Sequence, residues 1–250
     1  MTTRAVAGQL ASQLAEELLD RCGGGPCPQI DPWGLADTLG VAVFDDANLL
    51  EDGNFRWTAA GPVVMLRADA AIERRRFTLA HELGHVVARE DPFTSPLLGA
   101  ALDAFVHEET FCDALAGALL MPYCWVRDRF FGAPHDLGTV SRLAGEAGAS
   151  LSAALVRLRE VHGWRRVLLQ WRAEGGGWVY DAEAGLWPSE RGLIKPSEGT
   201  TWALSALRSR GPESTRIQLP LYVGGEHREL AAEVLFSRSR ALVLLDAPAG

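Results

Sequence analysis

The segment His81-Glu82-Leu83-Gly84-His85 constrains this chain more than any other, because apolar residues recur around it at helical spacing. On a helix, the two histidines lie one turn apart, about 6 Å along the axis, so both imidazoles can reach one metal ion. Zinc held by two imidazoles and one carboxylate keeps its fourth position for water and lowers the pKa of that water toward about 7. Glu82 can accept the proton of the water and pass it to a leaving amine. The sequence therefore predicts a helix with two zinc ligands and a general base.

The third ligand is expected from a second helix that begins near Glu109 and can pack antiparallel to the first. Asp113 lies four residues after Glu109 on the same helical face, where it can accept a hydrogen bond from the outer nitrogen of a metal-bound histidine and fix its tautomer. Glu108 is the alternative ligand, but it lies about 100° away around the helix and cannot share a face with both Asp113 and the metal. Glu109 is therefore the predicted ligand, and Asp113 is the predicted hydrogen-bond acceptor of a metal-bound histidine.

Two blocks of sequence, Arg76 to His85 and Glu109 to Pro122, resemble the signature blocks of the ImmA/IrrE metallopeptidases. The second block ends in Leu119-Leu120-Met121-Pro122, which is its more specific part. Upstream, the segment Asp31 to Val41 is similar to the short N-terminal helix and strand of that family, so the resemblance covers about Leu10 to His162.

The resemblance implies that His81, His85 and Glu109 bind Zn²⁺ and that Glu82 is the general base. The family often has Asn where this chain has Asp113, so the charge next to the metal ligands differs. The resemblance also implies a substrate, namely a helix-turn-helix transcriptional repressor that is inactivated by cleavage under stress or during mobile-element induction. An edge strand along the active-site cleft, to which an extended substrate can add, is implied in the same way.

Composition and charge favour a cytoplasmic enzyme. The 250 residues are 48% hydrophobic, enough for a substantial core, yet no stretch approaches the eighteen apolar residues of a membrane span. Glu16 and Glu17 stand where a signal peptide would need an apolar run. The four cysteines do not form tight Cys-x-x-Cys pairs, which disfavours a structural zinc site and a disulfide framework. They are Cys22, Cys27, Cys112 and Cys124.

A helix-turn-helix-like segment is predicted at residues 136–163, with helices at Leu137–Gly145 and Ser150–Val161. Basic residues are frequent here: Arg142, Arg157, Arg159, Arg165 and Arg166. The net charge of −8 disfavours a protein that binds nucleic acid through its whole surface. We favour the interpretation that these arginines form a solvated face on helices that close the peptidase domain, and direct nucleic-acid binding through this segment stays open as the alternative.

Helical spacing and turn residues place the elements before the motif. A helix is predicted over Thr3–Arg21, and Asp31 followed by Pro32 should begin the next helix. Strands are expected at Val41–Phe44 and Pro62–Arg67, with Asp52-Gly53-Asn54 as a hairpin turn between them.

A second domain is predicted at residues 164–250, where the composition shifts to aromatic and glycine-rich segments. The expected helix is Thr200–Arg208, and the expected strands are Val167–Trp171, Gly177–Tyr180, Arg216–Val223, Glu233–Ser237 and Ala241–Leu245. Some members of the resembled family carry a GAF-like sensor domain here, and this segment is interpreted as a reduced version or a substrate-docking domain. Four tryptophans are expected in its core rather than in a binding cage. They are Trp171, Trp178, Trp187 and Trp202.

The fold predicted from the sequence is α+β. It comprises a zincin-like metallopeptidase domain at residues 1–163, the appended helix-turn-helix-like helices, and a small C-terminal mixed-sheet domain. The predicted function is zinc-dependent endopeptidase activity, a limited cut in a regulatory protein. A second hypothesis is a non-catalytic metal-binding regulator that acts through the helix-turn-helix segment or the sensor domain. Glu82 favours the enzyme, because a vestigial metal site has no need of a general base.

Overall fold

The computed structural model describes residues 3–22, 30–90, 108–185, 192–207, 214–237 and 239–246. The chain forms two compact units. The first comprises Met1–Phe131 and Leu143–Ser150, and the second comprises Gly132–Arg142 and Leu151–Gly250. The α+β composition agrees with the prediction, but the division differs from the boundary expected at residue 163.

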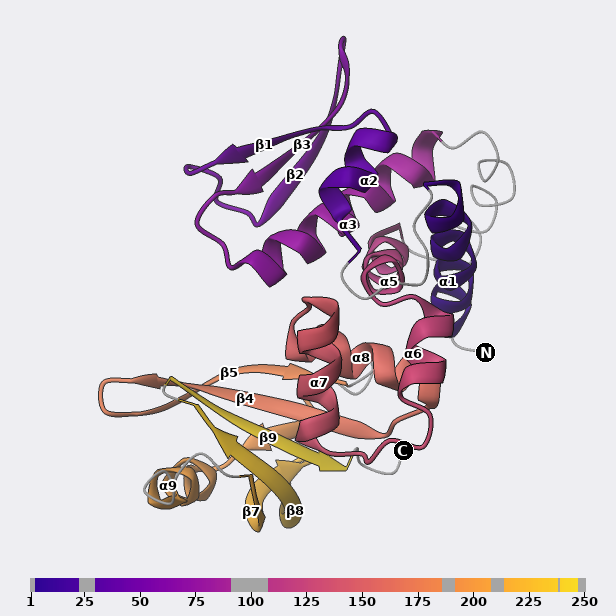
Figure 1. Cartoon of the computed structure of the whole chain (residues 1–250). Helices are drawn as coiled ribbons and strands as arrows, with labels where there is room; N and C mark the ends of the chain where they lie inside the picture. The colour runs from indigo at the N-terminus through magenta and orange to yellow at the C-terminus, as the bar shows by residue number, and fades with distance from the viewer. Residues whose placement is uncertain are drawn as a thin grey trace. The chain divides into compact units, whose positions relative to one another are not determined.

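The helices of the first unit surround α5 (Glu108–Leu120), which lies between α3 (Ile72–Glu90) and α1 (Thr3–Arg21) (Figure 1). Two short helices, α2 (Pro32–Thr38) and α6 (Tyr123–Arg129), also belong to the described part of this unit. Most of α5 is buried, because it packs on neighbours along more than one side. Its buried residues are Phe111, Cys112, Ala114, Leu115, Ala116, Ala118, Leu119 and Leu120.

Two sequence predictions about helix ends are confirmed. Helix α1 has the predicted bounds, Thr3–Arg21, and buries Leu14 and Leu18 on one face. Asp31 is the N-cap of α2, and its side chain accepts a hydrogen bond of 3.0 Å from the backbone N–H of Trp33.

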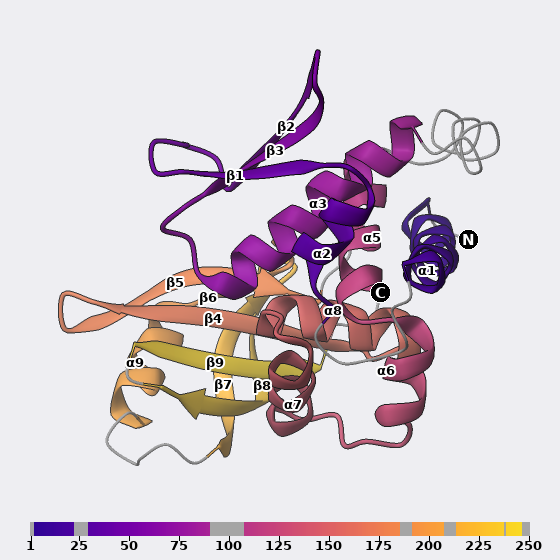
Figure 2. The ribbon, with the colours of Figure 1, turned by 45° about the horizontal axis from the view of Figure 1, so that its top comes forward.

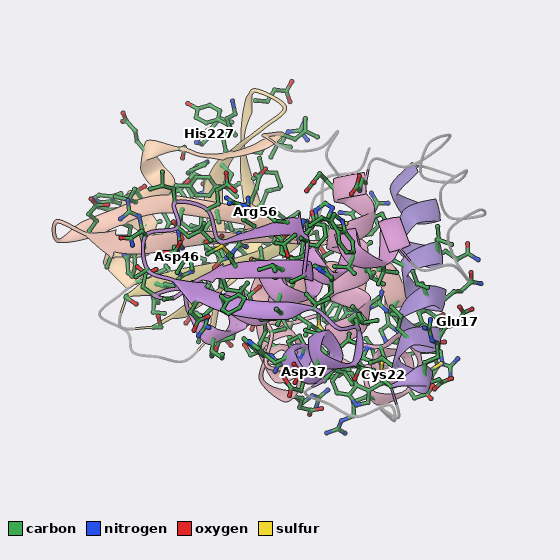
Figure 3. The ribbon with its side chains drawn as sticks, turned by 90° about the horizontal axis from the view of Figure 1, so that it is seen from above. Glu17, Cys22, Asp37, Asp46, Arg56 and His227 are labelled. Atoms are coloured by element: carbon green, nitrogen blue, oxygen red, sulfur yellow. The ribbon has the colours of Figure 1, made fainter. Side chains whose placement is uncertain are left out.

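A three-stranded sheet packs on α3 and has the strand order β1-β3-β2. Strand β1 (Ala42–Asp46) runs parallel to β3 (Gly61–Arg67), and β2 (Gly53–Thr58) runs antiparallel to β3 at the edge of the sheet. In the view of Figure 3, Asp46 marks the end of β1 and Arg56 marks β2. The sheet buries Val64 and Leu66 of β3 completely, which anchors the central strand.

The predicted hairpin turn at Asp52–Asn54 is wrong, because Gly53 and Asn54 begin β2 and the turn of the β2–β3 hairpin falls at Ala59 and Ala60. Gly53 is needed for packing rather than for turning. A Cβ at this position would clash with Thr78 and would lie 3.2 Å from the Glu82 carboxylate. The glycine therefore lets β2 approach α3 beside Glu82.

Arg76 fixes the start of α3 through backbone carbonyls. Its guanidinium donates to the carbonyl oxygens of Gly148, at 3.1 Å, and Ile30, at 2.7 Å. Burial lowers the pKa of Arg76. The planar guanidinium, with its donors set against two carbonyl oxygens, holds two chain segments to the helix that carries the histidines.

The second unit contains a six-stranded sheet with the order β5-β4-β9-β8-β7-β6. Every neighbouring pair is antiparallel, so the prediction of a mixed sheet is wrong. Its long β4–β5 hairpin is clear in Figure 2. The strands are β4 (Arg166–Glu174), β5 (Gly177–Ala184), β6 (Ile194–Pro196), β7 (Thr215–Val223), β8 (Glu226–Phe236) and β9 (Arg240–Asp246). All five predicted strands are present within these bounds or overlap them, and β6 was not predicted.

Helices cover both faces of this sheet. Helix α9 (Glu198–Leu207) buries Leu204 in the cluster that contains Val167 and Leu169 of β4. On the opposite face of β4, Gln170 donates a hydrogen bond of 2.8 Å to Ser152 of α8 (Leu151–His162). Both faces of β4 are buried as a result, which explains why it reads as a continuous apolar run.

The predicted helices at Leu137–Gly145 and Ser150–Val161 correspond to α7 (Leu137–Ala147) and α8. Residues up to Arg142 of α7 and all of α8 belong to the second unit. The contacts of α8 explain this assignment, because it packs on β4 and β5. The two helices were expected to close the peptidase domain, but most of their residues belong to the second unit. A helix-turn-helix function stays a prediction.

The tryptophan prediction is partly wrong. Trp171 and Trp178 lie in the core of the second unit, as predicted. Trp202 is 77% exposed on α9, because Leu204, rather than Trp202, faces the sheet. Trp187 lies outside the described residues. Among the helices that the structure describes, none has the length and apolarity needed to cross a membrane.

Candidate metal centre

Helices α3 and α5 meet at Gly84 and Cys112. A Cβ at Gly84 would lie 3.1 Å from both the Cα and the Cβ of Cys112 and 3.0 Å from its Sγ, so the two backbones could not approach as closely with any other residue. The glycine therefore permits a close approach of α3 and α5. Burial raises the pKa of the Cys112 thiol, so this cysteine is a packing residue that stays protonated.

Three ligand-type groups converge across this helix contact. The Nε2 atom of His81 lies 3.3 Å from Oε2 of Glu109, and the Nε2 atom of His85 lies 3.5 Å from Oε1 of the same carboxylate. One ligand atom from each residue falls within 4.8 Å of the other two. Two ligands about 2.1 Å from a tetrahedral zinc ion lie about 3.4 Å apart. The donor set and its spacing therefore fit one zinc ion with a further position open.

The outer nitrogens of both histidines contact carboxylates. The Nδ1 atom of His81 lies 3.0 Å from Oδ1 of Asp113, which is the contact that the sequence predicted for Asp113. The Nδ1 atom of His85 lies 2.7 Å from Oε1 of Glu108. With each Nδ1 donating to a carboxylate, each Nε2 is left as the acceptor that a metal requires.

The role of Glu108 in this arrangement was missed from the sequence, where Glu108 was considered as a competing metal ligand. The signal that could have found it is its position next to Glu109 at the start of α5. A rotation of about 100° moves its carboxylate away from the metal position but leaves it within reach of the second histidine.

Glu82 lies in the same turn of α3 and is buried, with 8% of its surface exposed. Burial raises the pKa of Glu82, an effect that the neighbouring imidazoles oppose and that Glu109 reinforces. A carboxylate with a raised pKa is better matched to proton transfer near neutral pH than an ordinary glutamate. The Gly53 contact places this carboxylate next to the edge strand β2.

The pKa of His81 is raised. Burial acts in the opposite direction, but the hydrogen bond to Asp113 and the charges of Asp113, Glu82 and Glu109 together outweigh it. This cluster of carboxylates around two imidazoles gives the site a strongly negative character, which favours a divalent cation.

Aromatic side chains of β2 line the same region. The rings of Phe55 and His85 are stacked with centroids 6.3 Å apart and planes 10° apart, and Trp57 packs edge-on against Phe55 at 5.4 Å. Gly53, Phe55 and Trp57 alternate along the strand, so they share the face of β2 that is directed toward α3. The edge strand therefore runs from Glu82 past His85.

Several arginines of the predicted helix-turn-helix region are engaged within the second unit. Arg157 is 2% exposed and pairs with Glu160 at 3.2 Å. Arg159 donates to the carbonyl of Gly185, and Arg166 donates to the carbonyl of His135. These contacts tie the three side chains into the second unit, whereas the sequence had placed them on a solvated face.

These features define a class of protein, the metallopeptidases in which one helix supplies two histidines and a glutamate and a second helix supplies a further acidic ligand. The profile of the IrrE N-terminal-like domain matches residues 36–159, which include every residue of the candidate site. The chain belongs to the ImmA/IrrE family of metallopeptidases.

Two curated relatives are similar over this region. The radiation response metalloprotease IrrE of Deinococcus radiodurans is 35% identical over 104 residues, which cover 39% of this chain and 31% of that protein. The protein of the same name from Deinococcus deserti is 33% identical over 103 residues, covering 39% of this chain and 36% of its own. The chain thus spans about a third of the length of these relatives.

A solved structure described as a Mycobacterium tuberculosis transcriptional regulator has a similar fold. Its TM-score is 0.54, and the match covers 98% of this chain and 81% of that chain at 15% sequence identity. At this identity the similarity concerns the fold alone.

Proposed function

We propose that the chain is a zinc-dependent endopeptidase that makes a limited cut in a regulatory protein. The observation that carries the proposal is the convergence of the His81 and His85 Nε2 atoms on the Glu109 carboxylate, with the buried carboxylate of Glu82 in the same turn. A zinc ion bound there would polarise a water molecule and the peptide carbonyl.

Residues of the chain would bind the metal, orient its ligands and transfer the proton. His81, His85 and Glu109 would hold the metal, and Asp113 would keep the His81 ring in the required tautomer and orientation. Glu82 would accept a proton from the attacking water and donate it to the amine that leaves. The raised pKa of Glu82 suits both transfers, because the group must take up and release a proton within one cycle.

An extended segment of substrate would add to β2. This strand lies at the edge of its sheet, and its backbone at Gly53 passes beside Glu82. Main-chain pairing with an edge strand would bring a peptide bond toward the general base without demanding a particular sequence. Phe55 and Trp57 would contact the side chains of that segment.

We propose a helix-turn-helix transcriptional repressor as the substrate, with cytoplasmic cleavage in a stress response. The support is family membership and the words radiation response metalloprotease in the names of the two Deinococcus relatives. The second unit would act as a sensor or docking domain of reduced GAF type, because its antiparallel sheet with α9 on one face forms a separate core.

The experiment is co-incubation with candidate helix-turn-helix repressors from the same genome, followed by intact-mass analysis. We expect two fragments whose masses sum to that of the repressor plus one water. Glu82→Gln should reduce the rate about a hundredfold or more, because the amide cannot accept the proton. Glu73→Gln, which changes an exposed glutamate at the start of the same helix, serves as the matched control and should cleave at the wild-type rate.

The alternative function, a non-catalytic metal-binding regulator, predicts a different outcome from the same experiment. The repressor would then remain intact with the wild-type chain and with Glu82→Gln alike. Cleavage at near wild-type rate by Glu82→Gln would instead show that peptidase activity is present but that Glu82 is not its base.

A further inference from the structure

We infer that Glu108 is a positioning residue for the second histidine of the metal centre. Its Oε1 atom lies 2.7 Å from Nδ1 of His85, a distance typical of a charge-assisted hydrogen bond. Because an ionised carboxylate can only accept, Nδ1 of His85 must donate, and Nε2 is left with its lone pair directed toward Glu109.

The geometry gives each histidine its own carboxylate. Asp113 serves His81, and Glu108 serves His85. Both carboxylates come from α5, where they flank Glu109 in sequence. A single helix therefore supplies the third ligand and the groups that orient the other two.

The environment of His85 makes this contact more important than a surface hydrogen bond. The side chain of His85 is 12% exposed and that of Glu108 is 37% exposed, so water competes weakly at the imidazole. Phe55 stacks against the His85 ring and limits its tilt, but an apolar ring cannot choose between the two tautomers. The hydrogen bond to Glu108 favours the tautomer of His85 that carries its proton on Nδ1.

The inference rests on the proposed zinc site and extends it to a residue outside the ligand set. Zinc affinity tests it, measured by competition with a chromophoric chelator on the full-length chain. Glu108→Ala removes the acceptor and should weaken zinc binding about ten- to a hundredfold. Glu108→Gln removes the charge but keeps an oxygen in place, so its affinity should stay within about threefold of the wild type.

A third variant of Glu108 tests its hydrogen bond separately from its charge, and a distant variant serves as the control. Glu108→Asp keeps the charge at the start of α5 but shortens the side chain by one carbon, so it should lose affinity although the helix start is preserved. Glu17→Gln removes a charge on the exposed side of α1 (Figure 3) and should bind zinc as the wild type does. Circular dichroism establishes that each variant is folded.

Substitution of Co²⁺ provides a second readout, because its visible absorption reports ligand geometry. The Co²⁺ spectrum should change in Glu108→Ala and Glu108→Asp and should match the wild type in Glu108→Gln and Glu17→Gln. A Glu108→Ala affinity within twofold of the wild type would overturn the inference, as would a Glu108→Gln loss equal to that of Glu108→Ala.

The outcomes also separate this inference from the proposed function. Wild-type zinc binding that Glu109→Ala abolishes and Glu108→Ala leaves unchanged would overturn the role of Glu108 alone. A wild-type chain that binds no zinc would overturn both.

Discussion

The substitution Gly84→Ala tests the contact that holds the two halves of the metal centre together. The added methyl group would lie 3.1 Å from the Cα and the Cβ of Cys112, atoms that cannot rotate away, so α3 and α5 must separate by a few tenths of an ångström. Overpacking of this kind costs about 1–3 kcal/mol. Alanine also stabilises a helix by about 1 kcal/mol relative to glycine, which partly offsets the packing cost.

Gly117→Ala is the matched control, because Gly117 lies in α5 and a Cβ there would meet open space. The gain in helix propensity is common to both variants, so their difference isolates the packing cost of about 1–3 kcal/mol. At about 2–4 °C per kcal/mol for a chain of this length, calorimetry of the metal-free protein should show a lower melting temperature for Gly84→Ala than for Gly117→Ala. Equal melting temperatures would refute the close-packing argument.

Three other outcomes are expected. Asp113→Ala should weaken zinc binding about ten- to a hundredfold without abolishing it, since every ligand remains, and an unchanged affinity would place Asp113 outside the site. Because the pKa of His81 is raised, protons should compete with zinc at a higher pH than for an ordinary histidine, so affinity measured between pH 8 and pH 5.5 should begin to fall above pH 6.5, by up to about tenfold per pH unit for each proton displaced. A chain that ends at His162 should aggregate in light scattering, because it exposes Leu155 and Leu158 of α8, which are buried in the full chain; a monodisperse, zinc-binding product would contradict the unit boundaries described above.

Local signals in the sequence were sufficient for much of the fold. The apolar spacing of α1, the Asp31 cap and the signature helix each depend on residues within a few turns, and each was placed correctly. The assignment of Gly53 to a turn failed for a different reason. Glycine serves turns and close approaches equally well, and the contact of Gly53 with Thr78 is a tertiary fact that its neighbours in sequence do not reveal.

The candidate site shows the same limit. Helix geometry was enough to place His81 and His85 on one face of α3, because it dictates which side chains share a face. Glu109 was predicted to join them from its position on a second helix and from the family resemblance, and the structure brings the three together. The contact between Glu108 and His85 depends on the direction and separation of α5 relative to α3, which no spacing within one helix determines. The exposure of Trp202 has a similar origin, because hydrophobicity alone does not decide which face of α9 meets the sheet.

The metal content of the purified chain tests the central claim most directly. Elemental analysis after dialysis should give close to one zinc per chain for the wild type and for Glu82→Gln, because the general base is not a ligand. His81→Ala and Glu109→Ala should fall to near zero. Near-stoichiometric zinc in both of these variants would contradict the site on which the proposed peptidase activity depends.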